Sequence, residues 1–219
     1  MYSAALDTAP GMAGFSLLKD GETVINVNWN MKGREASKLS CFILNELDNK
    51  QVKLEDISCW SVGSGPGSFT GLRQAAALVS GWCFGRTDIK TRCVPGAIAL
   101  AGAANPQDGQ TVCCIYDGRN KEILYYIVKF ENGDFQDTGK SGVLNQEQAE
   151  TFFAENKFDH TICFTGEYEA VKKIVPETLA VAMTDTADTS ILAKVKSVAF
   201  DNDLTRLVYI RPAVYLPEK

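Results

Sequence analysis

The most informative turn of this chain reads VGSGPGSFTGLR and runs from Val62 to Arg73. An apolar run precedes it and a long segment rich in small residues follows it, which predicts a strand, a tight turn and a helix start. Glycine accepts backbone angles and close contacts that a side chain forbids, and proline fixes one φ angle. Either Ser68 or Thr70 is suited to cap the helix.

Two interpretations of this turn stay open on its pattern alone. The unpaired N–H groups at the positive end of a helix suit a phosphate or a carboxylate. The same glycines equally allow a strand and a helix to pack tightly with no ligand present. The turn matches neither the G-x-x-x-x-G-K-[ST] motif nor a clean G-x-G-x-x-G motif, so its pattern does not choose between them.

Composition indicates a folded, cytoplasmic protein. The chain has 219 residues, of which 45% are hydrophobic, enough to form a buried core. Its net charge of −5 argues against binding of nucleic acid by this chain alone. No apolar run approaches the ~20 residues that span a bilayer, and the first residues lack the basic region of a signal peptide. The seven cysteines include no C-x-x-C pair, so we expect reduced thiols and no metal.

Periodicity predicts two α/β halves. Asp20-Gly21 separates alternating segments, which predicts that the first three strands form an antiparallel meander. A cluster of turn-forming residues at 105–109 predicts a boundary between a half at 1–104 and a smaller half at 105–219. The expected strands are Tyr2–Thr8, Ala13–Leu18, Val24–Trp29, Ile57–Val62, Lys90–Val94, Thr111–Tyr116, Ile123–Phe130 and Thr161–Thr165. The expected helices are Glu35–Leu47, Ser68–Phe84, Gly96–Ala104, Gln146–Glu155 and Asp188–Ala199.

Several short stretches occur here in the same order as in one known family. They are Asp7-Thr8, the glycine turn, Asp117-Gly118-Arg119 with Glu122 and Tyr125 after it, and Tyr215-Leu216. The chain resembles the TsaB (YeaZ) family of tRNA threonylcarbamoyladenosine biosynthesis proteins over nearly its whole length. The most specific part of the resemblance is the turn, with Gly65, Pro66, Gly67, Ser68, Thr70, Gly71 and Arg73.

The resemblance implies a fold and a function. The fold is an actin-like, ribonuclease-H-like (ASKHA) α/β fold, with two related halves that each hold a mixed sheet flanked by helices. Family members are non-catalytic partners of TsaD, which forms N6-threonylcarbamoyladenosine at position 37 of tRNAs that read ANN codons. TsaE, an ATPase, completes the bacterial complex. The resemblance further implies that tRNA is contacted only through this complex, and that the chain self-dimerises when alone.

The sequence has its own reasons to lack catalysis. The enzymatic relatives hold a metal through a histidine pair on one helix, whereas His160 is the one histidine of this chain. Ala36 stands where TsaB relatives often keep a histidine. No Ser-His-Asp set, Cys-His pair or zinc triad is present, which disfavours an enzyme related to proteases. We therefore expect no catalytic residues and no metal.

Nucleotide binding is the alternative function. In actin-like folds, turns after the first strand of each half hold the phosphates, and Asp7, Thr8 and Asp117 stand at the corresponding positions. The adenosine-side turn offers the single glycine Gly166, and the adjacent Glu167 would repel a phosphate. We expect weak or absent binding of ATP or ADP. An actin-like protein that binds or hydrolyses nucleotides remains the rival interpretation.

Two helices are candidates for a partner interface. They are the expected helices Glu35–Leu47 and Ser68–Phe84. Apolar residues cover a wider part of their surfaces than a single stripe facing the core requires. The resemblance implies that these helices pair with the two equivalent helices of TsaD, and the glycine turn would aim the second of them. The other interpretation is that both helices pack only on their own sheet. The candidate contact residues are Leu39, Phe42, Ile43, Leu72, Ala76, Val79 and Cys83.

Overall fold

The computed structural model describes residues 1–9, 12–30 and 37–210. The chain divides into two units: Met1–Ala99 with Asp188–Val208, and Leu100–Ala187 with the segment from Tyr209. The chain thus first passes from one unit to the other between Ala99 and Leu100, a few residues before the expected boundary after residue 104. Unlike the expected division, the chain also returns to the first unit at Asp188.

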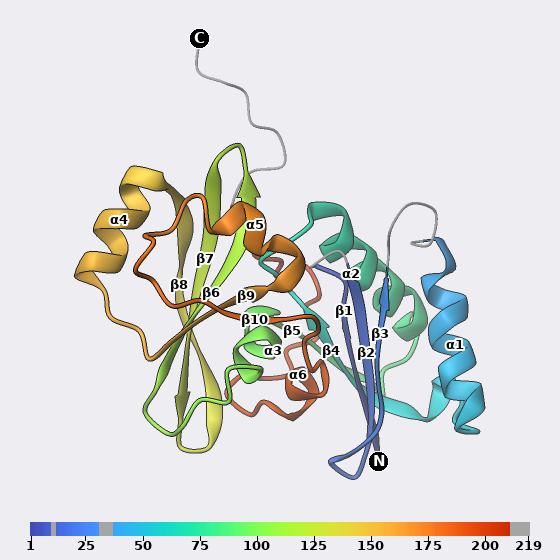
Figure 1. The fold of residues 1–219 in the computed structure, drawn as a ribbon. Coiled ribbons are helices and arrows are strands. Elements are labelled where there is room, and N and C mark those ends of the chain that lie inside the picture. The colour runs from blue at the N-terminus through green and yellow to red at the C-terminus, as the bar shows by residue number, and fades with distance from the viewer. Residues whose placement is uncertain (10–11, 31–36, 211–219) are drawn as a thin grey trace. The chain divides into compact units, whose positions relative to one another are not determined.

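The first unit is built on a five-stranded mixed sheet. Its strand order is β3-β2-β1-β4-β5 (Figure 1). The predicted meander is confirmed, because β1, β2 and β3 pair antiparallel, while β4 runs parallel to β1 and β5 runs parallel to β4. The strands are β1 (Tyr2–Asp7), β2 (Met12–Lys19), β3 (Glu22–Asn30), β4 (Ile57–Gly63) and β5 (Lys90–Val94).

Helices cover both faces of this sheet. On one face, α1 (Leu39–Asn49) and α2 (Phe69–Cys83) pack on a core that includes Phe15 and Trp60. On the other face lies α6 (Ser190–Lys194), where Thr189 contacts Ser16. Two shorter elements remain. η2 (Leu54–Asp56) precedes β4, and α3 (Ala97–Gly102) contains the point at which the chain passes into the second unit.

The expected helix Asp188–Ala199 is wrong in length, since α6 has only five residues. The cause is the buried side chain of Arg92 on β5. Its guanidinium donates to the carbonyl oxygens of Leu192, Ala193 and Val198, and the backbone leaves the helical conformation at Val195. Arg92 thus satisfies carbonyls that a longer helix would pair internally.

The second unit repeats the topology of the first. Its sheet order, β10-β9-β6-β7-β8, has the same sequence of parallel and antiparallel neighbours. The strands are β6 (Thr111–Arg119), β7 (Glu122–Glu131), β8 (Asp134–Asn145), β9 (His160–Phe164) and β10 (Ala182–Thr184). β8 was not predicted, because this long edge strand is mostly polar and half exposed and lacks a buried alternating face.

One helix of the second unit is confirmed at its predicted bounds, α4 (Gln146–Glu155). A capping box between Asn145 and Gln148 starts this helix. It packs with α5 (Tyr168–Val171), which follows η3 (Thr165–Glu167), on a core that includes Cys113 and Cys163. The short α5 replaces the long second helix of the first unit.

Two units with the same strand order and the same pattern of strand directions confirm the predicted fold class. Each unit is ribonuclease-H-like, and the pair makes an actin-like α/β fold. Among the described residues, no helix has the length and apolarity that crossing a membrane requires. Ala36 and Tyr215-Leu216 lie outside the described residues.

Candidate functional site

The glycine turn meets the end of the first strand. Because β1 and β4 are parallel neighbours, with Leu6 opposite Val62, their carboxyl ends lie at one edge of the sheet. Asp7 and Thr8 therefore lie beside the turn that follows Gly63. The structure thus brings together the two strongest sequence signals of the first half.

Asp7 lies in a slot between two glycines. A Cβ atom at Gly63 would stand 2.3 Å from Asp7 Cγ, and one at Gly96 would stand 2.4 Å from its Oδ2. The side chain is buried, and Oδ1 accepts a 2.9 Å hydrogen bond from the Ala9 N–H. Burial raises the pKa of Asp7 to about 6, against the opposing effect of hydrogen bonds from the backbone of Ala9 and Thr8. Gly96 was not among the predicted site residues, because only the tertiary structure brings it to Asp7.

The start of α2 is filled by the chain's own backbone. The Ser68 N–H donates a 2.7 Å hydrogen bond to the Ala9 carbonyl, and the Thr8 hydroxyl donates to the Gly71 carbonyl. A Cβ atom at Gly67 would stand 2.5 Å from the Ala9 oxygen, and one at Gly71 would stand 2.2 Å from the Thr8 oxygen. Two carbonyl groups thus occupy the space beside the positive end of the helix.

The glycines of the turn also have special backbone angles. The φ angle is +105° at Gly65 and +153° at Gly67, where side chains are strained. Ser68 is the helix cap, since its Oγ accepts from the Gly71 N–H at 3.3 Å, whereas Thr70 lies inside the helix. The Arg73 guanidinium stacks 3.8 Å from the centroid of the Phe69 ring.

The returning segment of the first unit closes the other side of the turn. The Val208 N–H donates a 2.7 Å hydrogen bond to the Ser64 carbonyl. Asn202 exchanges hydrogen bonds with Thr91, and so covers the outer edge of β5. These contacts join residues more than a hundred positions apart, and no local sequence signal predicts them.

The second unit places two acids at the corresponding corner. Asp117 is on β6, the counterpart of β1, and Gly166 is in η3, directly after β9. The Glu167 carboxylate accepts a 3.0 Å hydrogen bond from the Asp117 N–H. Burial, reinforced by the negative charge of Asp117, raises the pKa of Glu167 to about 7. The predicted residues Asp117 and Gly166 therefore lie in one corner together with Glu167.

Most of the proposed contact residues belong to the core of the first unit and require a correction. On α1 and α2 the buried positions recur every three or four residues, so they form the stripes that face the sheet. Phe42 is half-buried and stacks on Trp29, with 4.8 Å between ring centroids, and Cys83 is also half-buried. The fully buried members of the set are Leu39, Ile43, Leu72, Ala76 and Val79.

The exposed residues of these helices are different ones. Leu44 on α1 is 41% exposed, and Phe84 at the end of α2 is 89% exposed. Between Arg73 and Phe84, the exposed positions of α2 include Ala77 and Ser80. This surface, which we call the α2 outer face, comprises Arg73, Ala77, Ser80, Gly81 and Phe84. Its small central residues would let another helix approach closely.

The remaining candidate groups have structural partners. His160 begins β9, and its Nε2 lies 3.0 Å from Gln110 Oε1. All seven cysteines are free thiols, and Cys113 and Cys114 are both buried on β6. Burial raises the pKa of Cys113 above its ordinary range, which opposes thiolate chemistry. Within the described ranges, no three side chains of the metal-ligating types come together.

The fold and the glycine turn between β4 and α2 together define the class of protein. It is an actin-like protein in which this turn joins a strand to a helix by direct backbone packing. A family model described as "TsaD: tRNA N6-adenosine threonylcarbamoyltransferase" matches residues 36–210. The match covers most of the chain, and the chain belongs to this family.

Two curated relatives carry the name "tRNA threonylcarbamoyladenosine biosynthesis protein TsaB". The protein from Haemophilus influenzae is 29% identical over 122 residues, covering 55% of this chain and 51% of the relative. The protein from Escherichia coli is 27% identical over 150 residues, covering 67% of this chain and 64% of the relative. The matched region thus spans about half of one relative and under two thirds of the other. The predicted resemblance to TsaB proteins is confirmed.

A solved structure supports the fold. YeaZ from Pseudomonas aeruginosa superposes with a TM-score of 0.75 at 21% sequence identity, covering 95% of this chain and 99% of that chain. The similarity therefore extends through both units, in agreement with the repeated strand order.

Proposed function

We propose that this chain is a non-catalytic subunit that associates with TsaD and supports formation of N6-threonylcarbamoyladenosine in tRNA. The observation that carries the proposal is that the Thr8 and Ala9 carbonyls fill the space at the start of α2 where a phosphate would bind. The curated relatives of the chain are TsaB proteins. TsaE is the expected third component, and tRNA is contacted through the assembled complex. This role places the protein in the cytoplasm.

The chemistry of the corner supports a structural role. A phosphate at the start of α2 would compete with the Ala9 carbonyl, which accepts a hydrogen bond from the Ser68 N–H, and with the Thr8 carbonyl, which packs closely against Gly71. The neighbouring Asp7 is buried, and its carboxyl group supplies no positive charge that would attract a phosphate. The chain also has a single histidine, so the histidine pair of its enzymatic relatives cannot be assembled.

The surface of the first unit supports association. The α2 outer face presents small residues at its centre and an almost fully exposed Phe84 at its end. Exposed apolar side chains beside a smooth helical surface are typical of contact sites. The proposal is that TsaD docks on this face and on the exposed side of α1, and that a second copy of the chain uses it when TsaD is absent.

Nucleotide binding is weak or absent in this proposal. Asp7 on β1 and Asp117 on β6 lie on equivalent strands, which favours the rival interpretation. The Thr8 and Ala9 carbonyls nevertheless fill the start of α2, and the Glu167 carboxylate lies beside Asp117. Isothermal titration of the purified chain with Mg-ATP tests this point. We expect no saturable heat, and micromolar binding would contradict the expectation.

Association is tested by co-expression with TsaD of the same organism, followed by size-exclusion chromatography. We expect one peak that holds both chains in equal amounts. Separate elution at micromolar concentration would contradict the proposed partnership, while leaving the fold and the family unaffected.

A further inference from the structure

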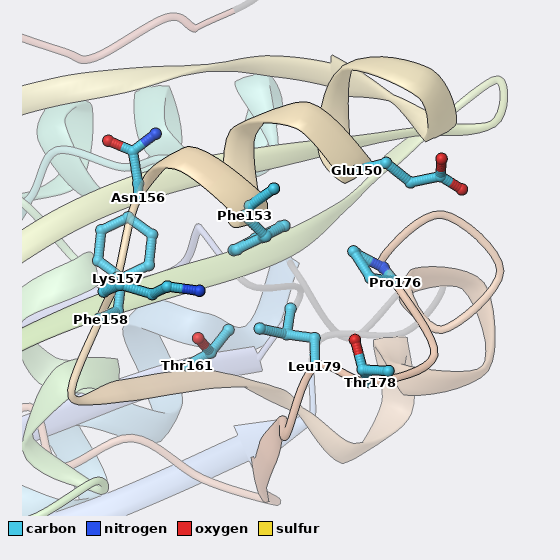
Figure 2. Close-up of a pocket in the computed structure, with 10 residues that line it drawn as sticks. Glu150, Phe153, Asn156, Lys157, Phe158, Thr161, Pro176, Thr178 and Leu179 are labelled. Carbon is cyan, nitrogen blue, oxygen red and sulfur yellow. The ribbon is translucent and has the colours of Figure 1, made fainter.

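A pocket lies beneath α4, entirely within the second unit. Its volume is about 370 Å³, in the range of small-molecule sites. Figure 2 shows that its walls come from α4, from the chain leading into β9, and from the loop at 176–179. The apolar part of the lining consists of Phe153, Ala154, Phe158, Pro176 and Leu179.

The strand register explains why the pocket exists. β10 pairs with β9 only from Ala182 onward, which lies opposite Ile162. Thr161, one residue earlier on β9, has Cys113 of β6 on one side and no β10 partner on the other. The pocket lies between α4 and the 176–179 loop, which both contribute lining residues.

Thr161 is a polar residue at the bottom of this space. The residue is only 6% exposed, and its hydroxyl makes no hydrogen bond to a described residue. Figure 2 shows the side chain directed toward the pocket. Buried hydroxyl groups nearly always have a partner, so an unsatisfied one that points into a pocket indicates a missing ligand or water.

Lys157 gives the same end of the pocket a positive charge. Lys157 lines the pocket together with Thr161, and in the view of Figure 2 its side chain lies on the same side as Thr161, with Glu150 on the other side. In the described part of the chain, no carboxylate lies within ion-pair distance of the Lys157 amine. The lining thus includes one buried donor, the Thr161 hydroxyl, and one exposed, positively charged donor, the Lys157 amine.

We propose that this pocket binds a small monocarboxylate with a compact apolar body. The apolar body would pack against Phe153, Phe158 and Leu179, and the carboxylate would accept hydrogen bonds from Thr161 and Lys157. Two converging donors match the two oxygens of a carboxylate, and one of these bonds is charge-assisted.

The test uses benzoate as the probe, with its neutral and cationic analogues. The ¹⁵N-labelled full chain is titrated with benzoate, benzamide and benzylamine while amide shifts are followed. We expect saturable shifts with benzoate that centre on Thr161 and Phe158, roughly tenfold weaker binding of benzamide, and none of benzylamine. The absence of saturable benzoate shifts through the millimolar range would overturn the proposal.

Variants separate this site from non-specific binding. Thr161→Val preserves the side-chain shape and removes the hydroxyl, and Lys157→Gln removes the charge. Each is expected to weaken benzoate binding roughly tenfold, whereas Lys173→Gln, an exposed lysine outside the pocket, leaves binding unchanged. We also expect the melting temperature of unliganded Thr161→Val to be no lower than that of the parent. Equal benzoate affinity in all three variants would overturn the proposal.

Discussion

A Cβ atom at Gly71 would stand 2.2 Å from the carbonyl oxygen of Thr8. This contact joins the first turn of α2 to the end of β1, and it involves backbone on both sides. A side chain at position 71 therefore cannot be accommodated by a rotamer change. The glycine is required for close approach of a strand and a helix, with no need to invoke a ligand.

Gly71→Ala should destabilise the first unit by about 1 to 3 kcal/mol, because the added methyl group forces the strand and the helix apart. Urea unfolding followed by circular dichroism measures the effect. Gly81→Ala is the matched control on the same helix, since a Cβ atom there meets nothing within 4 Å. The control should be stabilised by up to about 1 kcal/mol, as expected for alanine in an exposed helix. Equal effects of the two changes would contradict the packing role.

Asp7 should make the protein less stable as the pH rises. Its pKa is about 6 in the folded state, against an ordinary value of 3.8, so the unfolded chain loses the proton first. Its contribution therefore falls as the pH rises from about 4 to about 6, by up to about 3 kcal/mol. Asp7→Asn should remove this dependence and be more stable than the parent at pH 7. The comparison requires unfolding free energies at several pH values, and a constant difference between the two proteins would refute the expectation.

Arg92 should hold the returning segment on the first unit. Its guanidinium binds Ser61 and three backbone carbonyls, and it stacks on Phe200 at 4.2 Å. Arg92→Lys cannot reproduce this fork of donors and should cost about 3 kcal/mol. Hydrogen exchange should show the loss concentrated in residues 191–199. A variant with unchanged exchange in this segment would contradict the anchoring role.

Ala77→Arg should weaken association with TsaD at least tenfold without unfolding the chain, because the alanine is exposed at the centre of the α2 outer face. Phe42→Asp is a poorer test, since Phe42 stacks on Trp29 and packs on the core. Pull-down with tagged TsaD measures binding. Thr151→Arg, at an exposed position of α4, serves as the control and should bind normally. If both variants bind alike, the contact surface lies elsewhere.

Local signals predicted much of the fold correctly. Asp20-Gly21 predicted the hairpin of β2 and β3, Ser68 was one of the two candidate caps of α2, and the predicted start of α4 at Gln146 is confirmed. These features depend on a few neighbouring residues. The strand β8 was not predicted, because its half-exposed, polar sequence lacks the alternation of apolar and polar residues that a buried strand shows.

The site was harder to predict because it depends on distant contacts. The sequence located Asp7 and the glycine turn, but the slot that Gly96 completes exists only in the folded sheet. The apolar breadth of α1 and α2 likewise suggested contact residues that prove to be core, since a sequence does not show which face of a helix meets the sheet. The shortened α6 depends on Arg92, about a hundred positions away.

The central claim is that this chain supports threonylcarbamoyl transfer by association and has no transfer activity of its own. The most direct measurement is the amount of N6-threonylcarbamoyladenosine formed in tRNA by purified components supplied with the threonylcarbamoyl adenylate. With TsaE and ATP present throughout, we predict sustained product only when this chain and TsaD are combined, and none when this chain replaces TsaD. Product formed by this chain without TsaD, or equal product from TsaD with and without this chain, would contradict the account.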